Sequence, residues 1–597
     1  MYFSKKEVVM NYRKKLMLLL LASCFHEVRP MSVKVGSVDI VDPSGSSVAQ
    51  SDSQNFVEGQ QQIDAVEDGS DSSWSRSPWV VGGVAAAGLA AVGGLGLAYK
   101  TYWAEQPRDQ MQSGYELPGS DLLDQRATVT YDKLVSAGKA FDQKFPRVIS
   151  LDNKPQVVVQ QRLGTSQEIK RMAHGVYPIL DARVLVLIHD FLKYKRANGS
   201  SVEKALYSTM SVEQFITRCL TKRPVGFIQE RDQYLLKGDQ GWRYPDSDFE
   251  LIGTDREKGL LVLADYLSYD EMAISALLGV AVPTYFINNG NRHNYGKIDA
   301  HHQDKGVQIA QVGARFEKRG LMEWRHMIVA SEQNIPELGY GLDGAPDTSP
   351  LKMWENFYDL QFRTYEEAKE DTSGRFMLLG AHYFDKDVHE KQMKRLILPY
   401  LDKEVYKKRM KMVARPFLLE ANAQAKAVGK QAYVVVKGLG HGIWQPLDQQ
   451  KQLYFDVYAD LVTTLDLSNI SDINFSSVLK PADPFSIQDL RNHPIAIHVT
   501  QDNPSAKLTD SHENKLLVTQ YAWDGNAYPG NEYWAGMLAA SGDPAAVSSS
   551  LASYLQNPEV NPKYTGRYRA YGVNGDVASA GQSDHHLSDS QLKGEEL

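Results

Sequence analysis

A strand, a glycine-rich loop and an amphipathic helix follow one another between residues 432 and 465, and this order constrains the fold more than any other feature of the sequence. The run AYVVVK at 432–437 is β-branched and aromatic and ends at Gly438, as buried strands do. The loop GLGHGIW comes next, and apolar residues then recur at helical spacing as far as Leu465. The sequence therefore predicts an α/β crossover unit, in which the helix packs against a parallel sheet.

The chain between residues 150 and 562 has a mixed pattern of short apolar runs and amphipathic stretches without an internal repeat. Strands are predicted at 282–288, 307–312, 470–475, 494–500 and 515–523. Helices are predicted at 183–192, 211–219, 269–278, 388–398 and 405–428, the last with a break at Pro416 and a stop at Gly429. One large α/β domain is expected over residues 150–562.

The glycine loop is a candidate phosphate site. Gly438, Gly440 and Gly442 would let backbone N–H groups approach a diphosphate, since no Cβ stands in the way, and the following helix would add the positive end of its dipole. Trp444 ends the loop and offers a ring for stacking on a base or a ribose. The pattern is equally compatible with an ordinary tight turn after a strand, with Trp444 anchoring the loop in the core. Its glycine spacing differs from the dinucleotide-binding fingerprint.

The densest group of polar and aromatic residues lies between Trp523 and Pro544. Asp524 directly follows a predicted strand, so its side chain is expected at the carboxyl end of the sheet, where open α/β sheets bind ligands. Glu532 and Asp543 add two carboxylates, although Asp543 is equally suited to cap the helix that follows. The same stretch supplies two amides and a ring that suit ribose and base contacts: Asn526, Asn531 and Trp534.

A further candidate is Arg292 in the loop NNGNRHN, which is suited to contact a diphosphate or only to complete a turn. The histidines at 301–302, 382 and 389 lack a third ligand at metal-binding spacing, so no metal site is predicted. Neither a GxSxG motif nor a catalytic cysteine pattern is present, which gives nucleophilic acyl transfer no support. No cofactor is expected.

The net charge of −8 gives the chain no general attraction to phosphate backbones. Nucleic acid is therefore not an expected partner. The sequence has two cysteines, too few for a disulfide framework, so stability must come from packing.

The flanks of the domain differ from it in composition. Residues 1–30 resemble an export signal or reflect a misassigned start, and residues 31–78 have the composition of a disordered leader. Residues 79–99 are uncharged and long enough for one transmembrane helix, with a flexible or weakly inserting hairpin as the alternative. A juxtamembrane linker, helical from Leu122 onward, is expected at 100–149, and a disordered tail at 563–597. The expected location is thus a membrane, with a single span as anchor.

Four stretches of the chain resemble one known family: YDEMAISALLGVAVPTYFINNGNR, GVQIAQVGARFEKRGLMEWRHMIV, AYVVVKGLGHGIW and AWDGNAYPGNEYWAGMLAASGDPAA. They are similar to the macrodomain-like ADP-ribosylhydrolase family of the Legionella effector MavL, over residues 150–562. The resemblance implies a macrodomain-like α/β fold, a mixed sheet flanked by helices with a helical N-terminal extension. It also implies hydrolysis of ADP-ribose from a modified protein, with arginine-linked ADP-ribosylated ubiquitin as the expected substrate and a secreted bacterial effector acting in a host cell as the expected setting.

The resemblance places acidic catalytic and ribose-binding residues at Asp524, Glu532 and Asp543, and a ligand-binding glycine loop at 438–442. With ADP-ribose bound, the diphosphate would lie on this loop and the carboxylates at the anomeric carbon, where negative charge stabilises an oxocarbenium-like transition state. Water activation is assigned to Asp524, and ribose contact or support to the other two carboxylates. Two alternatives stay open: a reader that binds ADP-ribose without cleaving it, and a membrane-anchored interaction protein.

Overall fold

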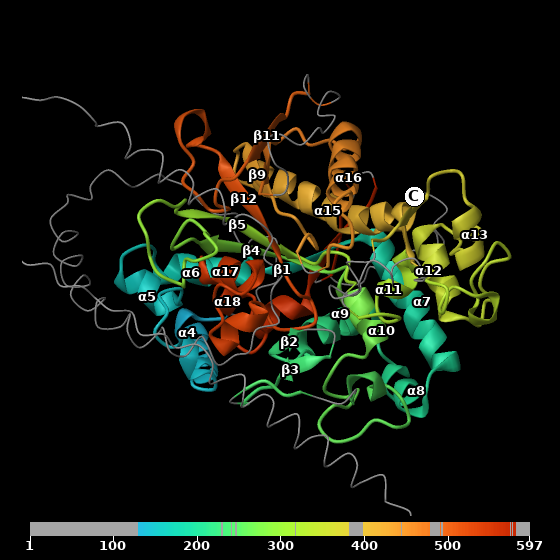
Figure 1. The fold of residues 1–597 in the computed structure, drawn as a ribbon. Helices are drawn as coiled ribbons and strands as arrows, with labels where there is room; N and C mark the ends of the chain where they lie inside the picture. The colour runs from blue at the N-terminus through green and yellow to red at the C-terminus, as the bar shows by residue number, and fades with distance from the viewer. Residues whose placement is uncertain are drawn as a thin grey trace, which may run out of the picture. The chain divides into compact units, whose positions relative to one another are not determined.

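The main sheet brings together strands from both ends of the described chain. The computed structural model describes residues 129–580, without 229–230, 240, 245–247, 317, 381–397, 443, 478–489, 491–492, 574 and 576. Within these residues nine strands form one sheet: β1 (Tyr177–Asp181), β4 (Gly279–Tyr285), β5 (Lys305–Gln311), β9 (Ala432–Val436), β10 (Ile470–Ser476), β11 (Ala496–Thr500), β12 (Leu516–Ala522), β13 (Tyr568–Tyr571) and β14 (Val577–Ala580). Their order across the sheet is β11-β10-β9-β12-β5-β4-β1-β13-β14. Figure 1 labels β11, β9, β12, β5, β4 and β1 of this sheet.

One half of the sheet is parallel and the other half is largely antiparallel. β11, β10, β9, β12 and β5 all run in the same direction, whereas β4 is antiparallel to both of its neighbours and β14 is antiparallel to β13. Parallel strands are normally covered on both faces, which requires continuous apolar runs. β9 meets this requirement, since all of its residues, AYVVV, are buried.

Helices and two small sheets surround this main sheet. The α-helices are α4 (Tyr131–Asp142), α5 (Pro155–Gln160), α6 (Ser166–His174), α7 (Ala182–Asn198), α8 (Ser201–Tyr207), α9 (Val212–Thr221), α10 (Tyr269–Ser275), α11 (Trp324–Met327), α12 (Pro350–Tyr358), α13 (Tyr365–Glu370), α15 (Lys403–Ala427), α16 (Gln450–Thr464), α17 (Gly542–Ser548) and α18 (Ala552–Leu555). The 3₁₀ helices are η2 (Pro146–Val148), η3 (Asp248–Leu251), η4 (Pro336–Leu338), η7 (Asp510–His512), η8 (Asn531–Ala535) and η9 (Pro562–Gly566). The small sheets pair β2 (Gly226–Ile228) with β3 (Gln233–Leu235), and β8 (Tyr400–Asp402) with both β6 (Ile328–Val329) and β7 (Phe376–Leu378).

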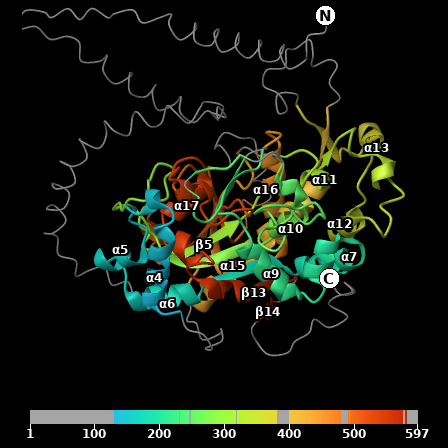
Figure 2. The same ribbon diagram turned by 90° about the horizontal axis from the view of Figure 1, so that it is seen from below.

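Two glutamines of β5 show that α15 and α17 lie on opposite faces of the sheet. The Gln311 amide donates to the Val413 carbonyl of α15 (2.6 Å), and the Gln308 amide donates to the Ala546 carbonyl of α17 (3.2 Å). Side chains alternate between the faces along a strand, so residues three positions apart point in opposite directions. Figure 1 shows α16 beside α15 and α18 beside α17. Figure 2 shows α4, α5 and α6 grouped at one end of the domain and α12 and α13 at the other.

Helix α15 continues through Pro416 instead of breaking there as the sequence predicts. The Asp402 side chain caps its start by accepting two backbone N–H groups, and Gly429 follows its end with a φ of +63°. A proline inside a helix removes one backbone hydrogen bond and costs about 3 kcal/mol. Pro416 and its neighbours, including Phe417, are buried, so packing of α15 against the sheet and against α16 outweighs this cost.

The other predicted elements agree in type with the structure, and their ends shift by a few residues. The predicted strands at 282–288, 307–312, 432–437, 470–475, 494–500 and 515–523 correspond to β4, β5, β9, β10, β11 and β12. The predicted helices at 183–192, 211–219 and 269–278 correspond to α7, α9 and α10. The predicted helix at 388–398 lies, but for its last residue, outside the described residues.

One flanking segment that was expected to lack a fold contains regular elements, and the other contains a helix where one was expected. The expected tail at 563–597 includes β13 and β14, which extend the sheet beside β1, and the linker at 100–149 includes α4 in its second half. The disordered tail was therefore predicted too early in the chain. Its short strands YRAY and VASA have few aliphatic residues, because strands near the edge of a sheet need less apolar surface than central ones.

The prediction of a single-pass membrane anchor is corrected. Within the described residues, the structure contains no helix that is both long enough and apolar enough to cross a membrane. The segment 79–99, on which that prediction rested, lies outside the described residues, as do the expected start at 1–30 and the leader at 31–78. The segment is rich in Gly and Ala, which gain little on transfer to hydrocarbon, so its uncharged length was weak evidence for a span.

Candidate active site

Three loops meet at the carboxyl ends of β9, β12 and β5, which are neighbours in the parallel half of the sheet. The glycine loop follows β9, the segment from Trp523 follows β12, and the segment 312–316 follows β5. Two of these loops pack backbone against backbone, because a Cβ on Gly313 would lie only 2.4 Å from the Gly440 nitrogen. Open α/β sheets bind ligands at this edge, and Asp524 lies on its central loop.

Asp524 is a buried carboxylate held by three neighbours. Its Oδ1 accepts from the Arg315 guanidinium (2.7 Å) and from the Asn526 N–H (2.9 Å), and its Oδ2 accepts from the Asn531 amide (3.2 Å). The residue is only 8% exposed, so its charge would be costly to bury without these donors. Arg315 also supplies the opposite charge, and together the three contacts fix the direction of the carboxylate.

Arg315 connects Asp524 to the glycine loop. Its guanidinium lies 5.0 Å from the centre of the Trp444 ring and 5.3 Å from the centre of the Phe227 ring, within the range of cation–π contacts. Sequence reasoning did not single out Arg315. The available signal was its position directly after the predicted strand at 307–312, on the same sheet edge as Asp524.

Asp543 and Glu532 complete a group of three carboxylates. Asp543 lies in the first turn of α17 and accepts from the Gly530 N–H (2.9 Å), while Ser541 occupies the N-cap position, so Asp543 does not cap this helix. Burial raises the pKa of Asp543 well above its ordinary value, and the negative charges of Glu532 and Asp524 raise it further. Asp543 therefore favours its neutral form. Glu532 is less buried and accepts from the Ser541 hydroxyl (3.3 Å).

The carboxylate loop, residues 524–543, depends on unusual backbone geometry. Gly525 and Gly530 have φ angles of +76° and +95°, and Asn531 has a φ of +36°, a left-handed conformation that asparagine tolerates. Asn531 is 3% exposed and exchanges two hydrogen bonds with the Phe227 backbone (2.8 and 3.1 Å). Asn531 therefore fastens the loop to β2 and directs its amide to Asp524.

The glycine loop combines close packing with open space. Gly440 has a φ of +74°, and a Cβ there would lie 3.2 Å from the Ala314 carbonyl oxygen. A Cβ on Gly442, in contrast, would meet no atom within 4 Å. The His441 ring lies edge-on to Tyr454 with their centres 4.8 Å apart, and burial lowers the pKa of His441 to about 3. Space for a ligand therefore adjoins Gly442, and the loop carries no histidine charge at neutral pH.

Trp534 has a structural position instead of the predicted contact with a ligand. It is 1% exposed, and its indole N–H donates to the Pro529 carbonyl (2.9 Å). The rings of Phe141 and Phe145 lie 4.8 and 5.8 Å from it, centre to centre. The prediction that Trp534 stacks on a base or a ribose is corrected, because Phe141 of α4 and Phe145 just after it cover the ring.

Arg292 also differs from its predicted role. Its guanidinium donates to the carbonyls of Ala539 (3.2 Å) and Ala540 (2.8 Å). These carbonyls belong to the segment that leads into α17, so Arg292 fastens the chain just before Asp543. Its placement gives no support to the predicted contact with a diphosphate on the glycine loop.

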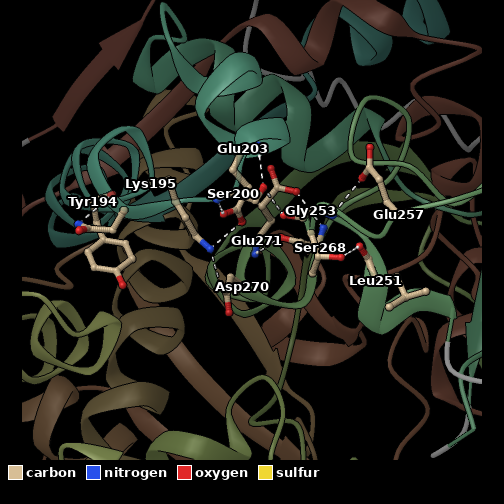
Figure 3. A network of polar contacts seen from close by, with 12 residues as sticks. Tyr194, Lys195, Ser200, Glu203, Leu251, Gly253, Glu257, Ser268, Asp270 and Glu271 are labelled. Carbon is tan, nitrogen blue, oxygen red and sulfur yellow. Dashed lines mark hydrogen bonds and ion pairs between the residues drawn. The ribbon is translucent and has the colours of Figure 1, made fainter.

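The described residues also form cavities elsewhere in the domain. One of about 650 Å³ opens beside Lys195 and the polar side chains around it (Figure 3). Neither this cavity nor a smaller one next to it is lined by Asp524, Glu532 or Asp543. Of the three acids in the carboxylate loop, Glu532 is the most exposed.

The fold and the site together define a class of protein. Three carboxylates from one loop, beside a glycine loop at the carboxyl edge of a mixed α/β sheet, suit the hydrolysis of a glycosidic bond in a phosphate-bearing substrate. Comparison with known proteins leads to the same class. The family described as "ADP-ribosylhydrolase MavL-like" matches residues 133–591.

Two curated proteins of Drosophila melanogaster are similar to this chain. ADP-ribosylarginine hydrolase CG2909 is 34% identical in a match of 427 residues that covers 68% of this chain and 80% of the fly protein. ADP-ribosylarginine hydrolase CG3568 is 34% identical in a match of 473 residues that covers 76% of this chain and 87% of the fly protein. The chain therefore belongs to the MavL-like ADP-ribosylhydrolase family, and it is an enzyme that removes ADP-ribose from proteins by hydrolysis.

These matches confirm the family and the enzyme class that the sequence motifs indicate. Hydrolysis is favoured over the alternative of a reader that only binds ADP-ribose. The comparisons do not support a bacterial effector or a ubiquitin substrate, because both relatives are insect proteins named for ADP-ribosylarginine.

Proposed function

We propose that this chain hydrolyses the N-glycosidic bond between ADP-ribose and an arginine side chain, and that the carboxylate loop is its active site. The observation that carries the proposal is the gathering of Asp524, Glu532 and Asp543, close enough for two of these acids to raise the pKa of the third. Crowded acids of this kind are costly to a fold and are typical of sites where charge is used in chemistry. The arginine linkage is supported by the names of both relatives.

The contacts of Asp524 suit a fixed negative charge better than a proton acceptor. Its oxygens already accept hydrogen bonds from Arg315, Asn526 and Asn531. Hydrogen bonds to a carboxylate weaken it as a base. An ionised carboxylate close to the anomeric carbon stabilises the positive charge that develops on the ribose ring in the transition state. We assign Asp524 this electrostatic role in place of the water activation expected from the sequence.

Glu532 then acts as proton acceptor and Asp543 as proton donor. Asp543 favours its neutral form, and its buried Oδ2 has no hydrogen-bond partner within the described part of the chain, so it is suited to donate a proton. Glu532 is more exposed and suits acceptance of a proton from the attacking water. The water oxygen bonds to the anomeric carbon as the carbon–nitrogen bond breaks, and the leaving guanidine takes the proton of Asp543. Two acids whose environments give them different pKa values can serve as proton donor and proton acceptor in one reaction.

The rest of ADP-ribose would extend from this loop to the glycine loop. The open space at Gly442 suits the diphosphate, whereas Gly438 and Gly440 are needed for the close packing of the loop. Trp444, half-buried against the core, offers a ring to the adenine or a ribose. Asn526, through its backbone N–H, and Asn531, through its side-chain amide, support Asp524 and are not proposed to contact the ligand directly.

The test compares one carrier protein that bears ADP-ribose on arginine, on serine or on glutamate. The full-length chain is added in excess, and release of ADP-ribose is followed in time by mass spectrometry. We expect the arginine conjugate to be cleaved at least about 10-fold faster than the other two, because a site built for one leaving group rejects others. Faster cleavage of the serine or glutamate conjugate would contradict the proposed linkage.

A further inference from the structure

A second polar cluster lies at the far end of the parallel strands from Asp524. Asp472 lies near the start of β10, His498 lies in β11, and His512 lies in η7, shortly before β12. β12 has seven residues and separates His512 from Asp524. At about 3.3 Å per residue this strand is roughly 20 Å long, so the cluster is distinct from the carboxylate loop.

The geometry of the cluster suits a metal ion. The His498 Nε2 lies 2.9 Å from the Asp472 Oδ1, and the His512 Nδ1 lies 3.6 Å from the same oxygen. One ligand atom from each of the three side chains lies within 4.8 Å of the other two. In a tetrahedral zinc site with bonds of about 2.0 Å, neighbouring ligand atoms are about 3.3 Å apart. The observed separations lie on both sides of this value, so a small adjustment would complete the site.

The surroundings hold the three side chains in place. The Ser471 hydroxyl donates to the Asp472 Oδ2 (2.6 Å). The Tyr433 ring stacks on His498 with a centre distance of 5.7 Å and meets His512 edge-on at 5.1 Å. Neighbours of this kind orient the ligands of metal sites and are a regular part of them. Both imidazoles are thus directed toward one buried carboxylate.

Lys515 supplies positive charge to the cluster. Its ammonium lies 2.5 Å from the Asp472 Oδ2 and 3.0 Å from the His512 Nδ1. An ammonium can only donate, so the His512 Nδ1 presents its lone pair to the cluster, as a metal ligand must. The Lys515 side chain is 19% exposed and flexible, which allows it to leave when another cation enters.

We propose that Asp472, His498 and His512 bind one Zn²⁺ ion per chain, and that Lys515 occupies the place of the ion when zinc is absent. Two imidazoles and one carboxylate form a ligand set that zinc accepts, with water as the fourth ligand. The histidine side chains are 32% and 30% exposed, so water reaches the ion. The ion would join the edge strand β11 to β10 and to the segment before β12. Its role is therefore to stabilise the sheet edge, not to take part in catalysis.

The experiment uses the full-length chain after treatment with a chelator and dialysis. Zinc is titrated by calorimetry, bound zinc is counted by elemental analysis, and Tm is measured with and without the metal. We expect one zinc ion per chain and a higher Tm in its presence. His512→Ala should lose this site. His301→Ala is the matched control, because His301 is an exposed histidine outside the cluster.

Lys515→Met separates a metal site from a simple ion-pair cluster. If zinc displaces the ammonium, loss of this charge should tighten zinc binding about 10-fold or more, since a unit charge near the ion repels it. Absence of zinc binding in both the wild type and Lys515→Met would overturn the proposal. So would equal zinc binding by His512→Ala, or preferential binding of Mg²⁺ or Ca²⁺. Lys515→Met removes no proposed ligand, so it tests the site even if His512→Ala fails to fold.

Discussion

Buried charges are paired with opposite charges in the cluster of Lys195, Glu203 and Asp270, here called the Lys195 network, whereas like charges lie close together in the carboxylate loop. In the network, the Lys195 ammonium lies 2.7 Å from Glu203 and 2.7 Å from Asp270 (Figure 3). Burial opposes the charge of Lys195, but these two carboxylates raise its pKa above the ordinary value. Glu203 also completes the capping box of α8. Each charge here has a partner and a place in secondary structure, as expected of an ion-pair network that only stabilises a fold.

In the carboxylate loop the charges are not balanced in this way. Arg315 pairs with Asp524, but Asp543 is buried near the negative charges of Asp524 and Glu532, which together raise its pKa. Left-handed backbone at Asn531 adds strain to the same loop. Burial of charge alone therefore does not mark an active site. A site for chemistry is recognised where like charges are forced together and the fold accepts the cost.

The largest effect is expected from a matched pair of substitutions in the two regions. Asp524→Asn keeps the size of the side chain but removes the charge that stabilises the cationic transition state. We expect it to slow release of ADP-ribose about 100-fold to 10,000-fold, with a much smaller change in ADP-ribose affinity. Asp270→Asn removes an ion-paired carboxylate charge from the Lys195 network and should leave the rate unchanged. The measurement is single-turnover release, with circular dichroism to show that both variants are folded.

The comparison of the two regions fails if Asp270→Asn loses as much activity as Asp524→Asn in folded protein. It also fails if Asp524→Asn retains the wild-type rate, because Asp524 would then be a structural ion-pair residue like Asp270.

Lys437 differs from Lys195 in its partners. Lys437 has no carboxylate partner among the described residues, and its Nζ contacts the Ser476 hydroxyl (3.2 Å). Burial lowers the pKa of Lys437 to about 8. It directly precedes the glycine loop, so we expect the phosphates of ADP-ribose to serve as its counter-charge. Lys437→Met should weaken ADP-ribose binding about 10-fold or more in calorimetry, the size of one hydrogen bond to a charged group.

The matched control is Lys430→Met, which changes a lysine just before the other end of β9 and should leave the affinity unchanged. In the wild type, affinity should fall as the pH rises through about 8, because Lys437 then loses its proton. Equal affinities for Lys437→Met and the wild type would show that this lysine does not face the ligand.

Much of the sheet could be predicted from local sequence, because its central strands are buried on both faces. Runs rich in apolar residues, such as 432–437 and 515–523, favour buried strands over other structures. The position of Asp524 at the carboxyl edge of the sheet could be predicted for a related reason, since a polar residue just after such a strand lies at that edge. β13 and β14 were missed because short strands near a sheet edge carry too little apolar pattern to be recognised.

The roles of individual site residues depended on contacts between distant parts of the chain. Trp534 looked available for stacking, and only the fold shows that Phe141 and Phe145 cover it. Arg315 follows β5 and reaches Asp524 only because β5 and β12 are neighbours in the sheet. Strand order is a property of the whole chain, so local patterns could predict the edge of the sheet but not the partners that meet there.

The smallest expected effect is on stability, and it has opposite signs in the two regions. Burial and two nearby negative charges raise the pKa of Asp543, so the folded state binds more protons than the unfolded state above about pH 4. Wild-type stability from this residue therefore declines as the pH rises through that window, up to the raised pKa. Asp543→Asn does not titrate, so its Tm should exceed that of the wild type by a few degrees at neutral pH and by less at pH 5.

For Asp270, burial opposes ionisation, but Lys195 and Arg325 lower its pKa, so its contribution is present at neutral pH and lost as the pH falls below about 4. Asp270→Asn should accordingly lower Tm at neutral pH and converge with the wild type in acid. Scanning calorimetry of both variants from pH 4 to 8 checks the signs, and a lower Tm for Asp543→Asn at every pH would mean that Asp543 stabilises the loop as a paired charge.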